Sequence, residues 1–203
     1  MIDTSAFQDK TAHYYTLGCK LNFSETSTFG NMLRELGVRT AEKGENADIC
    51  LINTCSVTSV ADRKCRQAIH RIIRENPGAF VVVTGCYAQL EAPAIAAIDG
   101  VDLVLGNNEK ARLVQLLSEA FTSSLPPLSP TPSPSNIIRQ EKAKDITSFA
   151  PSCSRGNRTR YFLKVQDGCD YFCTYCTIPF ARGLSRNPTI ASLVAQAEEA
   201  ARE

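Results

Sequence analysis

Three closely spaced cysteines, Cys169, Cys173 and Cys176, are the residues of this chain best suited to chemistry. Thiolates spaced in this way on a loop after a strand can converge on one metal centre. A structural zinc site takes four protein ligands, whereas a cubane iron–sulfur cluster held by three cysteines keeps one iron open for a substrate or cofactor. This group, the loop trio, therefore favours an iron–sulfur cluster. A zinc site completed by Cys153 is the alternative.

A second group of cysteines is spread along the sequence, but each member sits at the end of a predicted strand. We call Cys19, Cys55 and Cys86 the sheet trio. In open α/β sheets, ligands bind outside the carboxyl ends of the strands, where three such thiols would meet. This placement predicts a second three-thiolate site. The alternative is that all three are buried cysteines that pack as small hydrophobic residues.

The remaining cysteines follow neither pattern. Cys50 lies inside a predicted strand and Cys65 on the apolar face of a predicted helix, so we expect both to pack in the core. Nine cysteines are an odd number, and residues 1–10 have no charged-then-apolar signal pattern. Both observations argue against a disulfide framework and for a reducing, cytoplasmic location.

Composition narrows the class of protein. The chain has 203 residues, 43% of them hydrophobic and 21% charged, which is typical of one or two globular domains. The formal net charge of +1 excludes a uniformly basic nucleic-acid coat but leaves room for a local basic patch. The longest apolar runs have the length of strands, so we expect neither a transmembrane helix nor a membrane partner.

Strands and helices alternate through the first half of the sequence. The predicted strands are Tyr14–Leu17, Asp48–Thr54, Phe80–Thr84 and Val101–Leu105. The predicted helices are Asn22–Leu36, Thr58–Glu75 and Glu109–Ala120. This alternation predicts an α/β fold, a doubly wound parallel sheet with helices on both faces.

The composition changes after this first domain, which we place at residues 11–123. Leu125–Ser135 is rich in Pro and Ser, so residues 124–152 are predicted to be a linker. Residues 153–203 then offer one strand candidate, Arg160–Gln166, and one helix, Ile190–Arg202. One strand and one helix cannot bury a core, so we expect an N-terminal fragment whose second domain is truncated.

Basic residues gather locally. The helix Thr58–Asn76 carries five basic and two acidic side chains. Basic patches near a reactive centre suit a phosphate-rich partner such as RNA, and Arg63, Arg66 and Arg71 are the candidate contacts. A solvated helix face is the alternative reading of the same charges.

Taken together, these segments resemble the methylthiotransferase family of radical S-adenosylmethionine enzymes. The loop trio, within QDGCDYFCTYCTIPFARGLSR, is similar to the family's radical cluster motif. The segments TLGCKLNFSET, INTCSVTSVADRKCRQ and TGCYAQLE are similar to its N-terminal domain. The GCKLN sequence around Cys19 looks most like the branch that modifies N6-threonylcarbamoyladenosine in tRNA. Thr177 departs from the family pattern, which usually has an aliphatic residue there.

The resemblance implies a function. The loop trio would hold a 4Fe-4S cluster that binds S-adenosylmethionine, with Tyr175 near the adenosyl group, and the sheet trio would hold an auxiliary 4Fe-4S cluster. Residues 153–203 would be the first β/α unit of a radical-SAM partial TIM barrel. A methylthio group would pass to carbon 2 of N6-threonylcarbamoyladenosine in the tRNA anticodon loop, with electrons from a separate donor.

Three other outcomes stay open at this point. The same chemistry could act on isopentenyladenosine in tRNA or on an aspartate of a ribosomal protein. The chain could instead be a non-catalytic zinc or redox module. We also expect the 203-residue chain alone to be inactive, because most of the barrel that would enclose the radical is missing from it.

Overall fold

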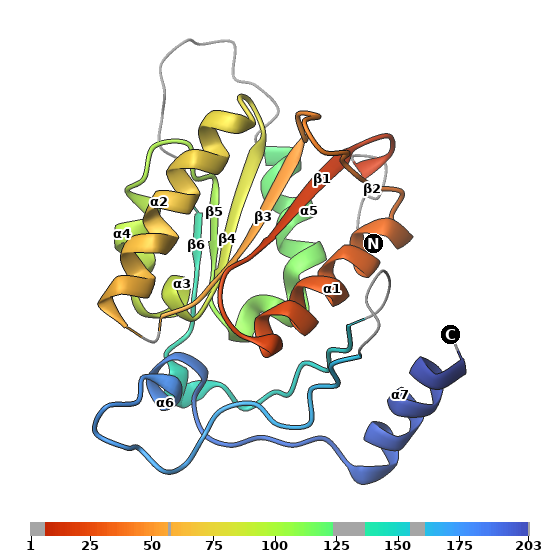
Figure 1. The fold of residues 1–203 in the computed structure, drawn as a ribbon, viewed down its shortest axis with the longest axis vertical. Helices are drawn as coiled ribbons and strands as arrows, with labels where there is room; N and C mark the ends of the chain where they lie inside the picture. The colour runs from red at the N-terminus through yellow and green to blue at the C-terminus, as the bar shows by residue number, and fades with distance from the viewer. Residues whose placement is uncertain (1–6, 57, 124–136, 155–160, 203) are drawn as a thin grey trace.

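A parallel β-sheet forms the centre of the molecule (Figure 1). The computed structural model describes residues 7–56, 58–123, 137–154 and 161–202. The sheet has six strands in the order β2-β1-β3-β4-β5-β6, and every neighbouring pair is parallel. The strands are β1 (Thr11–Thr16), β2 (Arg39–Thr40), β3 (Ile49–Thr54), β4 (Phe80–Gly85), β5 (Leu103–Leu105) and β6 (Ile137–Arg139).

Helices cover both faces of this sheet, as the alternating sequence predicts (Figure 1). On one face lie α1 (Lys20–Glu35), the 3-10 helix η2 (Asn108–Arg112) and α5 (Leu113–Ser123). On the other face lie α2 (Ser59–Glu75), α3 (Cys86–Leu90) and α4 (Ala92–Ala96). The α/β fold class is therefore confirmed.

Strand β3 shows why both faces are covered. Ile49 and Leu51 pack into the core beneath α1 and α5, whereas Cys50 and Ile52 pack into the core beneath α2. Successive side chains of a strand point to opposite faces, and all of these are fully buried, so a strand with apolar residues at every position requires two cores.

Helix α2 begins and packs as its sequence indicates. The hydroxyl of Thr58 accepts a hydrogen bond from the Ala61 N–H at 3.1 Å and caps the helix. Its buried residues are Cys65, Ile69 and Ile72, at the spacing of one helix face. Cys65, like Cys50 in β3, is a core residue.

The expected linker contains a strand. Ile137–Arg139, inside residues 124–152, forms β6 and pairs with β5 at the edge of the sheet. The Pro/Ser-rich run ends before Ile137, and the apolar residues after it can complete a parallel ladder with β5. Leu125–Ser135 itself lies outside the described residues. The division into domains at 123 and 152 stays a prediction.

The sequence predicts a strand over Arg160–Gln166, and this prediction is wrong for the residues that the structure describes there. Residues 161–166 have no strand, only an isolated antiparallel bridge between Leu163 and Cys153. The alternation of apolar and polar residues in this segment is loose, and its partner, around Ser152, is equally short. The barrel unit that this strand would begin stays a prediction.

The C-terminal segment contains three short elements. They are η3 (Ala143–Asp145), α6 (Ile178–Arg182) and α7 (Ile190–Arg202). Helix α7 has the predicted bounds, and the Thr189 hydroxyl accepts from the Ser192 N–H at its start. Among the described residues, no helix is both long and apolar enough to cross a bilayer.

Candidate functional site

The sheet trio lies at the carboxyl edge of the sheet. Thr54 of β3 pairs with Gly85 of β4, so Cys55 and Cys86 follow adjacent, registered strand ends. Cys19 follows β1 and is the N-cap residue of α1. The three thiols therefore come from three neighbouring strands to one edge, where open α/β sheets bind their ligands.

Glycines give the backbone room at this edge. Gly18 has a φ of +122°, and a Cβ there would lie 2.4 Å from the Cys55 Cβ and 2.9 Å from its Sγ. Gly85 has a φ of +103°, and a Cβ there would lie 2.2 Å from the Thr54 carbonyl oxygen. L side chains rarely adopt such φ values. Glycine at both positions therefore lets the loop before Cys19 and the start of α3 approach Cys55 closely.

The thiols of the sheet trio influence one another. Cys19 is exposed, whereas Cys55 and Cys86 are buried. Burial, followed by the neighbouring Cys86 and Cys19 thiols, raises the pKa of Cys55 to about 11, while Arg182 opposes this shift. Metal binding requires thiolates. Buried thiols that resist ionisation alone become good ligands once a metal group supplies the compensating positive charge.

The donor set of the sheet trio suits a thiolate-bound metal group. Cysteine thiolates are ligands of both zinc sites and iron–sulfur clusters. A structural zinc site takes four protein ligands, whereas a cubane cluster held by three cysteines keeps one iron open, so three thiols fit the cluster. Within the ranges that the structure describes, no three His, Cys, Asp or Glu side chains lie close enough together to hold a single metal ion.

The loop trio lies on the segment between Gln166 and α6. Cys169 and Cys176 are half-buried and Cys173 is exposed. The N–H of Cys169 donates to the Gly183 carbonyl at 3.1 Å, and the N–H of Cys176 donates to the Cys173 carbonyl at 2.9 Å. The first bond ties the start of the loop to the residue after α6, and the second forms a turn within the loop, while the middle cysteine is exposed.

One hydrogen bond joins the two trios. The hydroxyl of Thr177 donates to the Ser56 carbonyl at 2.6 Å. Thr177 follows Cys176, and Ser56 follows Cys55. In Figure 1, α6 lies next to α3 at the carboxyl edge of the sheet. Thr177, which departs from the family pattern, therefore links the residue after the loop trio to the residue after Cys55.

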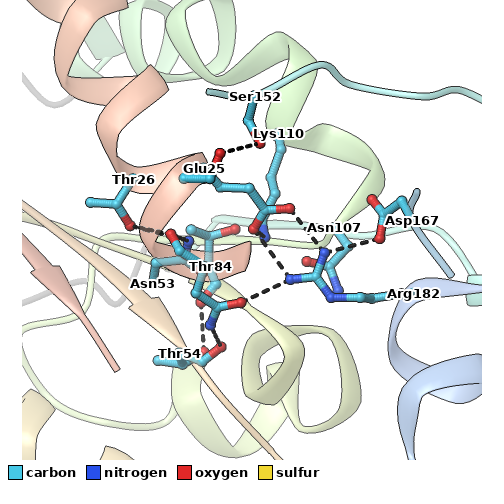
Figure 2. A network of polar contacts seen from close by, with 12 residues as sticks. Glu25, Thr26, Asn53, Thr54, Thr84, Asn107, Lys110, Ser152, Asp167 and Arg182 are labelled. Carbon is cyan, nitrogen blue, oxygen red and sulfur yellow. Dashed lines mark hydrogen bonds and ion pairs between the residues drawn. The ribbon is translucent and has the colours of Figure 1, made fainter. Parts of the chain in front are cut away.

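A buried ion network joins α1 and η2 to the segment that carries the loop trio (Figure 2). The carboxylate of Glu25 on α1 binds Arg182 at 2.9 Å, Lys164 at 3.2 Å and Lys110 at 2.5 Å. Asp167 binds Arg182 at 3.0 Å and Lys164 at 2.6 Å. Each of these side chains is at most 8% exposed.

Sequence reasoning missed this network. Its residues are scattered over the chain, from Glu25 to Arg182, and carry no periodic pattern or close spacing. The one available signal was an acidic residue inside the apolar-periodic stretch of α1. Burial raises the pKa of Glu25, but Arg182, Lys110 and Lys164 together hold it well below its usual range. The carboxylate is thus kept ionised in the interior.

The other predicted site residues lie at the surface. Tyr175 in the loop trio is 86% exposed. Arg63, Arg66 and Arg71 are exposed on α2, on the side turned away from the sheet. The Arg66 guanidinium donates to the Tyr87 hydroxyl at 2.6 Å, and Arg71 lies 3.7 Å from Glu75.

Comparison with known proteins identifies what this chain is similar to. Residues 11–106 match the family model described as uncharacterized protein family UPF0004. The matched range contains β1 to β5 and the whole sheet trio.

Particular relatives extend the similarity beyond this domain. The chain is 37% identical to the threonylcarbamoyladenosine tRNA methylthiotransferase MtaB of Bacillus subtilis, over 93% of this chain and 40% of that protein. It is 37% identical to the protein of the same name from Aquifex aeolicus, over 90% of this chain and 43% of that protein. It is 33% identical to the tRNA-2-methylthio-N(6)-dimethylallyladenosine synthase of Sphingopyxis alaskensis, over 93% of this chain and 40% of that protein. The chain thus spans about 40% of the length of these relatives.

Proposed function

We propose that this chain provides the two cysteine sites of an enzyme that transfers a methylthio group to carbon 2 of N6-threonylcarbamoyladenosine next to the tRNA anticodon. The observation that carries the proposal is the 2.6 Å hydrogen bond from Thr177, the residue after Cys176, to the carbonyl of Ser56, the residue after Cys55. Moving sulfur onto a carbon that must first be activated requires both sites within reach of one substrate atom. Similarity to two threonylcarbamoyladenosine tRNA methylthiotransferases over at least 90% of the chain supports this substrate.

The residues of each trio have separate tasks in this proposal. The loop trio holds one four-iron four-sulfur cluster, with an open iron for S-adenosylmethionine, and the sheet trio holds the other. When bound, these groups supply the radical and sulfur chemistry that acid–base side chains cannot perform at an unactivated C–H bond. Tyr175, between the last two cysteines of the loop trio, is exposed and has an aromatic face for the adenosyl group.

The reaction on tRNA can be tested by nucleoside analysis. We expect a strain without the gene to lack the methylthio group on N6-threonylcarbamoyladenosine, and the wild-type gene to restore it. A gene in which the loop trio is changed to Ala is the matched control and should not restore it. Loss of the methylthio group from isopentenyladenosine, or from a ribosomal-protein aspartate, would instead assign one of those substrates. Unchanged modification of all three would overturn the proposal.

The basic face of α2 is the proposed contact with the anticodon stem. We expect the triple variant Arg63→Ala/Arg66→Ala/Arg71→Ala to bind a tRNA anticodon stem-loop more weakly. The slope of log K against log salt should become less steep by about 2 to 3, since each phosphate contact contributes about 0.9. Titrations at several salt concentrations measure this slope.

A matched triple variant controls for lost charge. Arg34, Arg39 and Arg112 are also exposed, but they lie on α1, β2 and η2, away from α2. Their change to Ala removes the same charge and should leave the slope unchanged. Equal slopes for both triple variants would show that α2 has no particular role in RNA binding.

A further inference from the structure

The buried ion network connects two parts of the chain that carry different cysteines. Glu25 and Lys110 come from α1 and η2 of the α/β domain. Lys164, Asp167 and Arg182 come from the segment that carries the loop trio. Figure 2 shows Arg182 reaching from α6 between the two carboxylates. The network is therefore an interface between the two cysteine-bearing parts.

Arg182 is linked to the sheet trio through one side chain. Its Nη2 donates to the Asn22 Oδ1 at 2.8 Å, and the Cys19 thiol lies 3.6 Å from the same oxygen. The Asn22 amide in turn donates to the carbonyls of Leu17 at 3.1 Å and Thr54 at 2.9 Å, just before the first and second cysteines of the trio. A single asparagine thus transmits the position of Arg182 to two loops of the sheet trio.

Arg182 is also linked to both ends of the loop trio. Its Nη1 donates to Asp167 at 3.0 Å, two residues before Cys169. Asp167 and Arg186 exchange two backbone hydrogen bonds, at 2.9 and 2.7 Å. Gly183, directly after Arg182, accepts the N–H of Cys169. Arg182 therefore contacts the residue that precedes the loop trio and lies next to the glycine that closes the loop.

The kinds of side chain in the network indicate that it positions the two parts of the chain rather than stabilising the fold. Four cations, Lys110, Lys164, Arg182 and Arg186, face two carboxylates, and each of these side chains is at most 10% exposed. Replacing buried ion pairs with apolar side chains is often neutral or stabilising, so such a network is a poor way to gain stability. A planar guanidinium is suited to bind several acceptors at fixed angles, which a lysine cannot do. Arg182 uses this property on Glu25, Asp167 and Asn22 at once.

We infer that Arg182 is a positioning residue, held by Glu25 and Asp167, that fixes the loop trio against the sheet trio through Asn22. The inference rests on the proposed function for its purpose, since fixed spacing matters only if both trios serve one reaction. The geometric claim stands by itself. The loop that carries Cys169, Cys173 and Cys176 should lose its fixed place when the forked contacts of Arg182 are lost, while the sheet stays folded.

Hydrogen exchange of the metal-free 203-residue chain tests this inference. The variants are Arg182→Lys, which keeps the charge but not the fork, and Arg182→Gln, which removes the charge. In both, the exchange rates of amides in residues 167–186 should rise at least about tenfold more than those of amides in β3 and β4, whose rates report the change in global stability. Glu75→Gln, which removes the exposed partner of Arg71, is the control and should change neither region.

Each other outcome overturns the inference. Unchanged exchange in 167–186 would show that the loop is held without Arg182. An equal rise in β3 and β4 would show that Arg182 contributes global stability only. If Arg182→Lys kept the slow amide exchange of residues 167–186, the positive charge and not the forked hydrogen bonds of the guanidinium would hold the loop. Iron content after anaerobic reconstitution is measured separately: a wild-type chain without iron would contradict the proposed function and leave the exchange result intact.

Discussion

The variant Glu25→Gln will have a free energy of unfolding about 3 to 5 kcal/mol lower than the wild type, because removing one partner of a buried ion pair leaves an uncompensated buried charge. Glu25 alone faces Arg182, Lys110 and Lys164 in the interior. Without its charge, Arg182 and Lys164 keep only the carboxylate of Asp167, and Lys110 loses its ion pair with Glu25. Denaturant unfolding followed by circular dichroism measures the difference.

The pH dependence of this effect has a defined sign. The pKa of Glu25 is held well below its usual range in the folded chain. A carboxyl with a lowered folded pKa stabilises the protein above its unfolded pKa, about 4.3, and the stabilisation is lost as the pH falls through the folded pKa. The difference in free energy of unfolding between the wild type and Glu25→Gln should therefore be largest near pH 7 and become smaller in acid.

A surface pair is the control for this prediction. Glu75 lies 3.7 Å from Arg71 on α2, and both side chains are more than half exposed. Exposed pairs contribute about 0 to 1 kcal/mol, so Glu75→Gln should leave the unfolding curve nearly unchanged. Similar losses for Glu25→Gln and Glu75→Gln would contradict the central role of Glu25.

The second large effect is expected from Gly85→Ala, with a loss of about 2 to 6 kcal/mol. Backbone strain at a φ of +103° contributes about 1 to 3 kcal/mol, and a forced contact in a packed interior adds about the same. The new Cβ would lie 2.2 Å from the Thr54 carbonyl oxygen and 2.6 Å from the Thr54 nitrogen, neither of which can rotate away. Denaturant unfolding of the variant measures the loss.

Gly44 separates the two contributions. Its φ is +89°, close to that of Gly85, but a Cβ there would meet no atom within 4 Å. Gly44→Ala should therefore show only the cost of the φ angle, about 1 to 3 kcal/mol. If Gly44→Ala and Gly85→Ala cost the same, the close approach at the end of β4 is not a constraint on the site.

The sequence predicted those parts of the fold that local patterns determine. The run Phe80–Val83 is apolar at every position, as is typical of a strand buried on both faces, and it lies in β4. The cysteine after such a strand lies at the carboxyl edge in a parallel sheet, which is why the placement of the sheet trio followed from sequence.

Features that depend on distant partners could not be predicted in this way. Ile137–Arg139 is a strand because β5 offers an open edge, and three residues carry no periodicity of their own. Residues 161–166 contain similar side chains but bridge only to Cys153. Glu25 and Arg182 are 157 positions apart, and only the folded chain shows that they bind each other.

Iron and sulfide content after anaerobic reconstitution tests the central claim, that the chain carries two separate three-cysteine cluster sites. We expect about eight irons in the wild type and about four in each of the variants Cys169→Ala/Cys173→Ala/Cys176→Ala and Cys19→Ala/Cys55→Ala/Cys86→Ala. Cys153→Ala, which removes the proposed fourth zinc ligand, should keep about eight. Zinc in place of iron, or no metal in the wild type, would contradict the claim, and so would the loss of all iron on removing either trio.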